Sequence, residues 1–197
     1  MSRESEINCL NKVIQNFYSS STSLLCDNRE KILEILKSAQ PNEDKNKFPD
    51  FVFTNGFIEH FEVTSAKETA KGSAHRIKQA EFDRETTKRF ENLKKELQES
   101  PLSSSLKTES YKEVWDDYSY EMYQKSFEKN WKKHILSFDK YKGEKDIGIF
   151  LIEYKGALLK KMQHNQFQGF YKLSEDIDLL NFISKYSDKI HYIVFTD

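Results

Sequence analysis

The sequence predicts an α/β protein in which a mixed β-sheet is flanked by helices. Residues 147–154 (IGIFLIEY) form a nearly continuous apolar run, which is typical of a strand buried on both faces of a sheet. Residues 48–67 hold two β-forming runs on either side of Asn55-Gly56, which predicts a β-hairpin. Several other segments show the apolar periodicity of helices. Helices and strands mixed in this way along one chain are typical of the α/β class.

The length and composition favour one soluble domain. A chain of 197 residues suits a single hydrophobic core, so residues 1–197 are expected to form one domain. Hydrophobic residues make up 37% and charged residues 32%, the net charge is −1, and no apolar run is long enough to cross a membrane. The start MSRESEIN does not resemble a signal peptide, and Cys9 and Cys26 lack zinc-site spacing. These features predict a cytoplasmic protein with no membrane partner.

The N-terminal region is predicted to contain two helices. Residues 4–18 carry an apolar stripe on one face, and the polar run 19–23 ends this pattern. Asp27 is expected to cap a second helix, with Glu30 completing a capping box. Pro41 ends the second helical pattern, and a charged loop then leads into the hairpin.

The register of the hairpin decides which side chains share a face of the sheet. A turn made by Asn55 and Gly56 alone would place Asp50 opposite Phe61 and would set Asp50 and Glu62 on opposite faces. A loop one residue longer would place Asp50 directly opposite Glu62. Hydrophobic matching favours the longer loop because that register separates an apolar face from a polar one. The apolar face would comprise Phe51, Phe53, Phe61 and Val63, and the polar face Asp50, Val52, His60, Glu62 and Thr64.

Two long helices are predicted in the middle of the chain. Residues 70–99 show a thin apolar stripe, which is typical of a helix that stands partly away from the core. Residues 110–140 carry aromatic side chains at helical spacing, interleaved with lysines, and core packing is favoured over stacking on bases. Residues 66–140 are therefore predicted to include a long helical pair that forms a protruding arm and that could support a homodimer.

The C-terminal region is predicted to complete the sheet. Strand 147–154 is expected to turn at Lys155-Gly156 into a short partner strand over residues 157–161. Ser174 is expected to cap a helix that ends near residue 186. Residues 190–195 are expected to form the last strand.

The favoured register predicts a metal site that resembles a nuclease motif. Two opposed carboxylates repel, so Asp50 and Glu62 together indicate a bound cation. Pro49-Asp50 at a strand start, Glu62 on the next strand and a nearby lysine resemble the PD-(D/E)XK, or restriction-endonuclease-like, superfamily, whose core has the element order αβββαβ. The resemblance implies Mg²⁺ or Mn²⁺ as cofactor, with Asp50, Glu62 and the carbonyl group of Val63 as its ligands.

The lysine of that motif is displaced in this chain. Thr64 stands where the family has a lysine two residues after the glutamate. The resemblance therefore implies a migrated lysine, and Lys67 and Lys71 are the favoured catalytic candidates because a cation there would offset developing charge. Lys78 and Gln79 on the following helix are further candidates for the same role.

Basic residues follow the strand that carries Glu62. The predicted nucleic-acid contacts are Lys71, His75, Arg76 and Lys78, and an ordinary solvated helix face is an equally weighted alternative. Glu6 is a candidate third carboxylate, although a solvated helix residue is favoured there. His60 is a candidate transition-metal ligand, although a hydrogen-bonded neighbour of the carboxylates is favoured.

Three functions follow as hypotheses. The first is a metal-dependent endonuclease that hydrolyses phosphodiester bonds in nucleic acid, with DNA preferred, in mobile-element or defence biology. The second is a catalytically inactive module on the same scaffold that binds nucleic acid. The third is a protein-interaction module in which Asp50 and Glu62 are ordinary surface charges.

Overall fold

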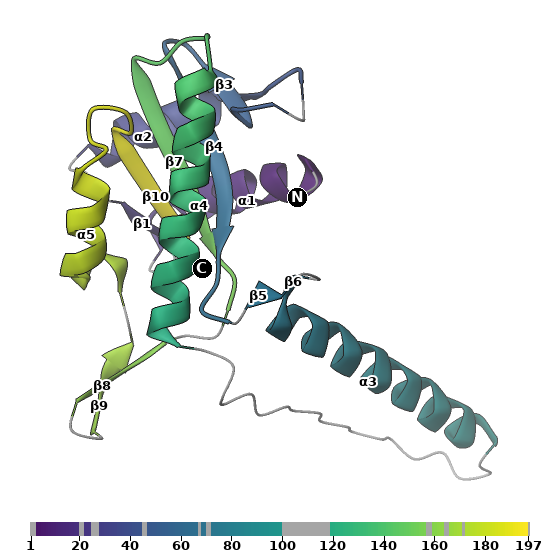
Figure 1. Ribbon diagram of the computed structural model, residues 1–197. Coiled ribbons are helices and arrows are strands. Elements are labelled where there is room, and N and C mark those ends of the chain that lie inside the picture. The colour runs from purple at the N-terminus through teal and green to yellow at the C-terminus, as the bar shows by residue number, and fades with distance from the viewer. Residues whose placement is uncertain are drawn as a thin grey trace.

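A mixed β-sheet with helices on both faces forms the body of the protein (Figure 1). The computed structural model describes residues 3–19, 22–24, 28–44, 47–66, 68–69, 72–99, 119–156, 159–163, 166–170 and 172–196. The sheet has six strands in the order β1-β10-β7-β4-β3-β2. Their bounds are Thr22–Leu24 (β1), Gln40–Pro41 (β2), Phe51–Phe53 (β3), Gly56–Val63 (β4), Ile147–Tyr154 (β7) and Tyr192–Thr196 (β10). The predicted α/β class with a mixed sheet and flanking helices is confirmed.

The strands divide into a parallel centre and antiparallel flanks. β4, β7 and β10 run parallel to one another, with β4 and β7 paired over eight residues from Gly56↔Ile147 to Val63↔Tyr154. On one side, β2, β3 and β4 form an antiparallel meander, and on the other side β1 pairs antiparallel with β10. Parallel strands need long crossovers, and here helices supply them, as expected for buried parallel pairs.

Two layers of helices cover the sheet. The helices α1 (Arg3–Gln15) and α2 (Arg29–Ser38) lie on one face, and α4 (Tyr120–Lys140) and α5 (Ile177–Ser184) lie on the other (Figure 1). The helix α3 (Ala74–Glu99) extends away from the sheet. A short 3₁₀ helix (Leu173–Glu175) and two small hairpins, β5–β6 (Glu68–Thr69, Gly72–Ser73) and β8–β9 (Lys160–Gln163, Gln166–Phe170), complete the described elements.

Each layer has its own hydrophobic core. On the α1 side, Val13, Ile32 and Leu36 pack against Ile58 and Ile149 of the central strands. On the α4 side, the core is aromatic and includes Phe61, Phe127, Trp131, Phe150 and Phe182. The aromatic residues predicted over 110–140 therefore serve as core in the part of that segment that the structure describes. This outcome matches the favoured expectation, because large aromatic side chains at helical spacing bury the most apolar area.

The two long helices do not form the antiparallel pair that the sequence pattern favoured. In Figure 1, α4 lies flat on the sheet, whereas α3 points away from it. The apolar stripe of α4 is wide enough to pack against the central strands of the sheet, whereas the stripe of α3 is too thin to pack in this way. Of the two long helices, α3 extends away from the sheet and α4 does not.

The N-terminal caps of two helices lie one and two residues beyond those that the sequence predicts, and one strand has a different partner. The side chain of Asn28, rather than Asp27, caps α2 by accepting a hydrogen bond from the backbone N–H of Lys31 at 3.3 Å. Asp176, rather than Ser174, caps α5 through the N–H of Leu179 at 3.1 Å. The strand that follows Gly156 pairs with β9 and not with β7, because β10 and β4 already occupy both edges of β7.

The hairpin register differs from both registers considered from the sequence. Phe51 lies opposite Ile58 and Phe53 lies opposite Gly56, so Thr54 and Asn55 form the turn. Asn55 takes the left-handed conformation at φ 68°, which asparagine tolerates better than most residues. Gly56 is instead required by packing, because a Cβ atom there would lie 2.1 Å from the carbonyl oxygen of Ile147. The predicted register, with Asp50 opposite Glu62, is therefore wrong.

Among the described residues, no helix combines the length and the apolar character that a bilayer crossing requires.

We expect Phe127→Ala to destabilise the protein strongly. Phe127 is fully buried against Tyr123, Trp131 and Phe182, so its truncation should lower the free energy of unfolding by about 3 to 5 kcal/mol. Urea denaturation followed by circular dichroism measures this change. Leu136→Ala, on the same helix at 62% exposure, is the matched control and should stay within about 0.5 kcal/mol of the wild type. Equal effects of the two substitutions would contradict the described packing of α4.

Candidate functional site

Two carboxylates meet where the β3–β4 hairpin opens. The register that pairs Phe51 with Ile58 brings Asp50, just before β3, to Glu59 on β4. The backbone N–H of Asp50 donates to Oε2 of Glu59 at 3.1 Å, and the N–H of His60 donates to Oδ2 of Asp50 at 2.8 Å. Each acid is thus held in place by the backbone of the neighbouring strand.

His134 of α4 fixes the second carboxylate from the side. Its Nδ1 lies 2.5 Å from Oε1 of Glu59, and its ring stacks on Phe61 with centroids 4.8 Å apart. Burial lowers the pKa of His134 to about 4, so the imidazole is neutral at physiological pH. The contact is therefore a hydrogen bond between an imidazole and a carboxyl group, and it orients Glu59 without neutralising it.

The site concentrates acidic groups in a buried setting. Burial, together with the charge of the adjacent Glu59, raises the pKa of Asp50 to about 7. Burial, together with the charge of Glu6 on α1, raises the pKa of Glu59 to about 8. We call Asp50 and Glu59 the acidic cluster. Such a cluster retains its charge only when a cation is close, and otherwise it retains protons.

The predicted partner of Asp50 lies on the other face of the sheet. Side chains alternate along β4, with Phe61 and Val63 in the aromatic core on the α4 side, so Glu62 points toward the α1 side. Asp50 instead lies with Glu59, which contacts α4 through His134. The predicted joint ligation by Asp50 and Glu62 is thus wrong, because the two-residue turn shifts the strand pairing by three positions along β4.

The carbonyl group predicted as a third ligand is part of the backbone network. The oxygen of Val63 accepts the N–H of Lys155 at 2.8 Å, which continues the pairing of β4 with β7. Val63 itself is 1% exposed in the core. The structure therefore does not bring Asp50, Glu62 and Val63 together.

The predicted basic residues fall largely outside what the structure describes. Lys67 and Lys71 are outside the described residues. His75, Arg76 and Lys78 lie in α3, but their side chains are also outside the described part of the structure. The proposed roles of these five residues stay predictions from the sequence.

A second polar group is buried on the α1 side of the same strands. Cys9 of α1, His60 of β4 and Glu153 of β7 each offer a ligand atom, and these atoms all lie within 4.8 Å of one another. Oε1 of Glu153 also forms an ion pair with Nζ of Lys155. Figure 1 shows how α1 crosses behind the two strands at this point.

Some of these residues could have been recognised from the sequence. Glu153 interrupts the apolar run IGIFLIEY, and a charged residue within a fully buried strand has to find a partner. Glu59 likewise interrupts the apolar run from Gly56 to Phe61. His134 gave no comparable signal, because a polar residue next to a helical apolar stripe is common.

Comparison of the chain with protein-family models, with curated proteins and with solved structures gave no match. The chemistry of the site therefore has to be argued from its own side chains.

We expect the acidic cluster to make metal-free stability fall as pH rises. The folded-state pKa values of Asp50 and Glu59, about 7 and 8, lie above the ordinary values of 3.8 and 4.5. Protonation of these two groups therefore contributes fully to the free energy of unfolding below about pH 4, and this contribution is lost as the pH approaches 8. In a chelating buffer, Asp50→Asn and Glu59→Gln should each lose less free energy of unfolding between pH 5 and pH 8 than the wild type. Urea denaturation at the two pH values measures the difference.

Glu62→Gln provides the control for this pH effect. It makes the same chemical change on the same strand but on the other face of the sheet. Its pH dependence should match that of the wild type. A wild-type pH dependence in Glu59→Gln would contradict the description of a buried carboxyl pair.

Proposed function

We propose that this protein is a metal-dependent nuclease that hydrolyses phosphodiester bonds of nucleic acid at the acidic cluster. The observation that carries the proposal is the adjacency of two carboxylates, the half-buried Asp50 and the buried Glu59, with the backbone N–H of Asp50 donating to Oε2 of Glu59 at 3.1 Å. The charge of Glu6 on α1 also raises the pKa of both carboxyl groups. Carboxylate oxygens at this density are the ligands of Mg²⁺ and Mn²⁺, so the donor set fits such an ion.

The order of the elements supports the same proposal. The helix α1, the meander β2-β3-β4, the helix α4 and the parallel strand β7 occur in the order αβββαβ that the sequence resemblance implies, with β1 and α2 inserted after α1, and with β5, β6 and α3 inserted after β4. The strand β2 supplies the first strand of that order, for which the sequence shows no clear pattern. Asp50 precedes the second strand and Glu59 lies on the third, the two strands that carry the acidic residues in the resemblance.

The side chains of the cluster have separable roles in the proposed reaction. Asp50 and Glu59 would hold the cation. The bound cation would lower the pKa of a water ligand, which makes that water a better nucleophile, and would stabilise negative charge on the phosphate. His134 fixes one oxygen of Glu59 and leaves the other toward Asp50. Two hydrogen bonds from the backbone and one from the imidazole thus set the orientation of both carboxyl groups before substrate binds.

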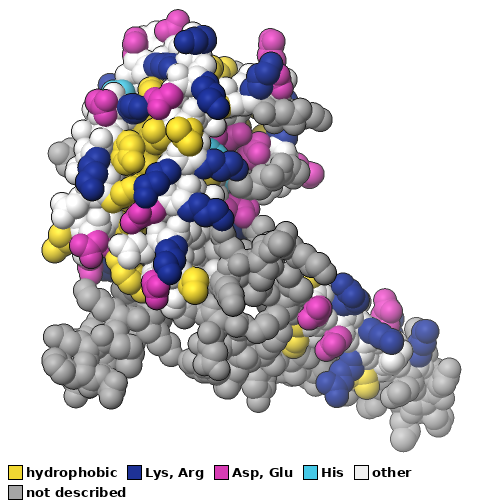
Figure 2. All heavy atoms as spheres, viewed as in Figure 1, with side chains coloured by type: hydrophobic (Ala, Val, Ile, Leu, Met, Phe, Trp, Pro, Cys, Tyr) yellow, Lys and Arg dark blue, Asp and Glu magenta, His cyan; other side chains and the backbone are white. Residues whose placement is uncertain are grey.

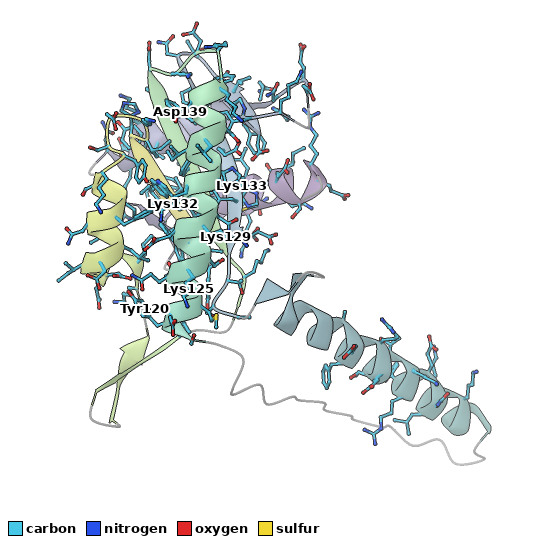
Figure 3. All side chains as sticks on the ribbon, in the orientation of Figure 1. Tyr120, Lys125, Lys129, Lys132, Lys133 and Asp139 are labelled. Atoms are coloured by element: carbon cyan, nitrogen blue, oxygen red, sulfur yellow. The ribbon has the colours of Figure 1, made fainter. Side chains whose placement is uncertain are left out.

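A lysine of α4 takes the place of the motif lysine in this proposal. Phe61 stands two residues after Glu59, so the strand itself supplies no cation there. Lys133 precedes His134 on α4, and its charge lowers the pKa of Glu59. Figure 3 labels Lys133 on the side of α4 next to β4. An ammonium group at this position can offset negative charge that develops on the phosphate.

The exposed face of α4 offers a path for the phosphate backbone. Lys125, Lys129, Lys132 and Lys133 are exposed and follow one another along the helix (Figure 3). Figure 2 shows basic side chains gathered over this face, with acidic side chains among them. Lys125 and Lys132 form ion pairs with Glu121 and Glu128 of the same helix. Lys133, whose charge lowers the pKa of Glu59, and Lys129, one turn before it on α4, are chosen as the tests of phosphate contact.

We expect cleavage to depend on both carboxylates of the pair. Asp50→Asn and Glu59→Gln should each lower the rate of nicking by about two orders of magnitude or more, the usual cost of removing one group that stabilises transition-state charge. The assay follows supercoiled plasmid and end-labelled RNA with Mg²⁺ or Mn²⁺ over time. A thermal shift by either ion, present in the wild type and lost in Glu59→Gln, measures ion binding without turnover.

Glu62→Gln is the matched control for cleavage. It should retain wild-type activity because Glu62 lies on the opposite face of the sheet from Asp50. Loss of activity only in Glu62→Gln would refute the acidic cluster as the catalytic site. Salt-dependent binding of nucleic acid without cleavage in either ion would replace the nuclease proposal with that of an inactive binding module.

We expect the double substitution Lys129→Glu/Lys133→Glu to weaken nucleic-acid binding and reduce its salt dependence. Each phosphate contact removed should lower the slope of log K against log salt by about 0.9 for duplex DNA. Fluorescence anisotropy at several salt concentrations gives this slope. Lys37→Glu on α2, an exposed lysine of the opposite helical layer, should leave the slope unchanged. Equal slopes for the double variant and the wild type would exclude the α4 face as the contact surface.

A further inference from the structure

The buried group on the α1 side of the sheet has the composition of a transition-metal site. We infer that Cys9, His60 and Glu153 bind one Zn²⁺-like ion through a thiolate, an imidazole nitrogen and a carboxylate oxygen. The three residues come from three different elements, α1, β4 and β7, which the tertiary structure alone brings together.

The distances and burial suit a single small ion. One potential ligand atom from each residue lies within 4.8 Å of the other two. Cys9, His60 and Glu153 are 3%, 2% and 5% exposed. Ligands about 2.0 to 2.3 Å from a zinc ion lie roughly 3 to 4 Å from one another, so small rotations of the side chains would complete the site.

Unsatisfied polar atoms provide an independent reason to expect a ligand. Neither Nδ1 nor Nε2 of His60 has a hydrogen-bond partner, and Oε2 of Glu153 also has none. The Nε2 and Oε2 atoms lie 3.3 Å apart, as in an ion pair, but without the alignment of a hydrogen bond. Leaving a buried polar group unsatisfied is unfavourable, and an ion between these atoms removes that penalty.

The kinds of donor atoms select the class of ion. Sulfur and nitrogen ligands favour Zn²⁺ and related first-row ions, whereas Mg²⁺ and Ca²⁺ take oxygen ligands. The site is therefore distinct in chemistry from the oxygen-rich acidic cluster. It is also distinct in space, because the consecutive residues Glu59 and His60 project to opposite faces of β4.

Lys155 orients the carboxylate of Glu153 without being a ligand itself. Its Nζ contacts Oε1 of Glu153, while Oε2 faces Nε2 of His60. Contacts of this kind orient ligands at metal sites, and their loss usually weakens metal binding by about 10- to 100-fold. Lys155 is thus expected to position Glu153 rather than to bind the ion.

A cavity next to the group leaves room for a fourth ligand. It has a volume of about 320 Å³ and is lined by Cys9 and Glu153, together with Lys12, Lys155 and residues of the first turns of α1. Three protein ligands with one open position are typical of zinc sites that admit water or an exogenous ligand.

We expect cobalt to report directly on the proposed thiolate ligand. The full chain, freed of metal by chelation, should bind about one Co²⁺ and develop a sulfur-to-cobalt charge-transfer band that Zn²⁺ abolishes by displacement. Cys9→Ser should lose this band and bind Co²⁺ at least about 10-fold more weakly, and His60→Gln should bind more weakly by a similar factor. Optical titration gives both the band and the affinity.

The second cysteine supplies a matched control. Cys26→Ser should keep the cobalt band and the affinity of the wild type. Far-ultraviolet circular dichroism of each variant shows whether it folds. Absence of the band in the wild type, or its survival in Cys9→Ser, would overturn the proposal, and neither result would bear on cleavage at the acidic cluster.

Discussion

The parallel pairing of β4 with β7 is the interaction on which the rest of the structure depends. The two strands pair over their whole length and are covered on both faces by helices, so nearly all of their side chains are buried. Alternation along β4 sends Phe57 and Phe61 into the aromatic core under α4 and sends Ile58 into the core under α1. The meander, the crossover helix α4 and the first helix are all placed relative to this pair.

Polar residues in the central pair are costly, and their positions therefore carry information. Glu59, His60 and Glu153 are each at most 5% exposed. A hydrophobic residue at any of these positions would stabilise the core more, since burying charge is unfavourable unless it is well paired. The residues instead gather in two groups with partners from flanking helices, His134 on one face and Cys9 on the other. Buried polar groups gathered in this way are characteristic of binding sites, where a loss of folding stability accompanies affinity for a ligand.

The shortness of strand β3 helps to explain why the acidic cluster forms near this edge of the sheet. β3 pairs with β4 only from Gly56 to Ile58, so Glu59 lies at the point where this pairing ends. Asp50 reaches Glu59 from the bend before β3, where Asp50 is half-buried. Glu59 is 5% exposed and is held from the core side by His134.

Local patterns in the chain were enough to locate most elements but not their partners. The run from residue 147 to 154 identified β7, the Asn55-Gly56 signal identified the hairpin, and the apolar stripe identified α1, because each depends on neighbours a few residues away. The register of the hairpin escaped prediction because Gly56 is set by close contact with Ile147, a residue far along the chain. Both candidate sites depend on that register and on helix contacts from residues 9 and 134. Short-range sequence patterns thus determined which segments became strands and helices. Long-range packing alone decided which polar side chains lie together in the two candidate sites.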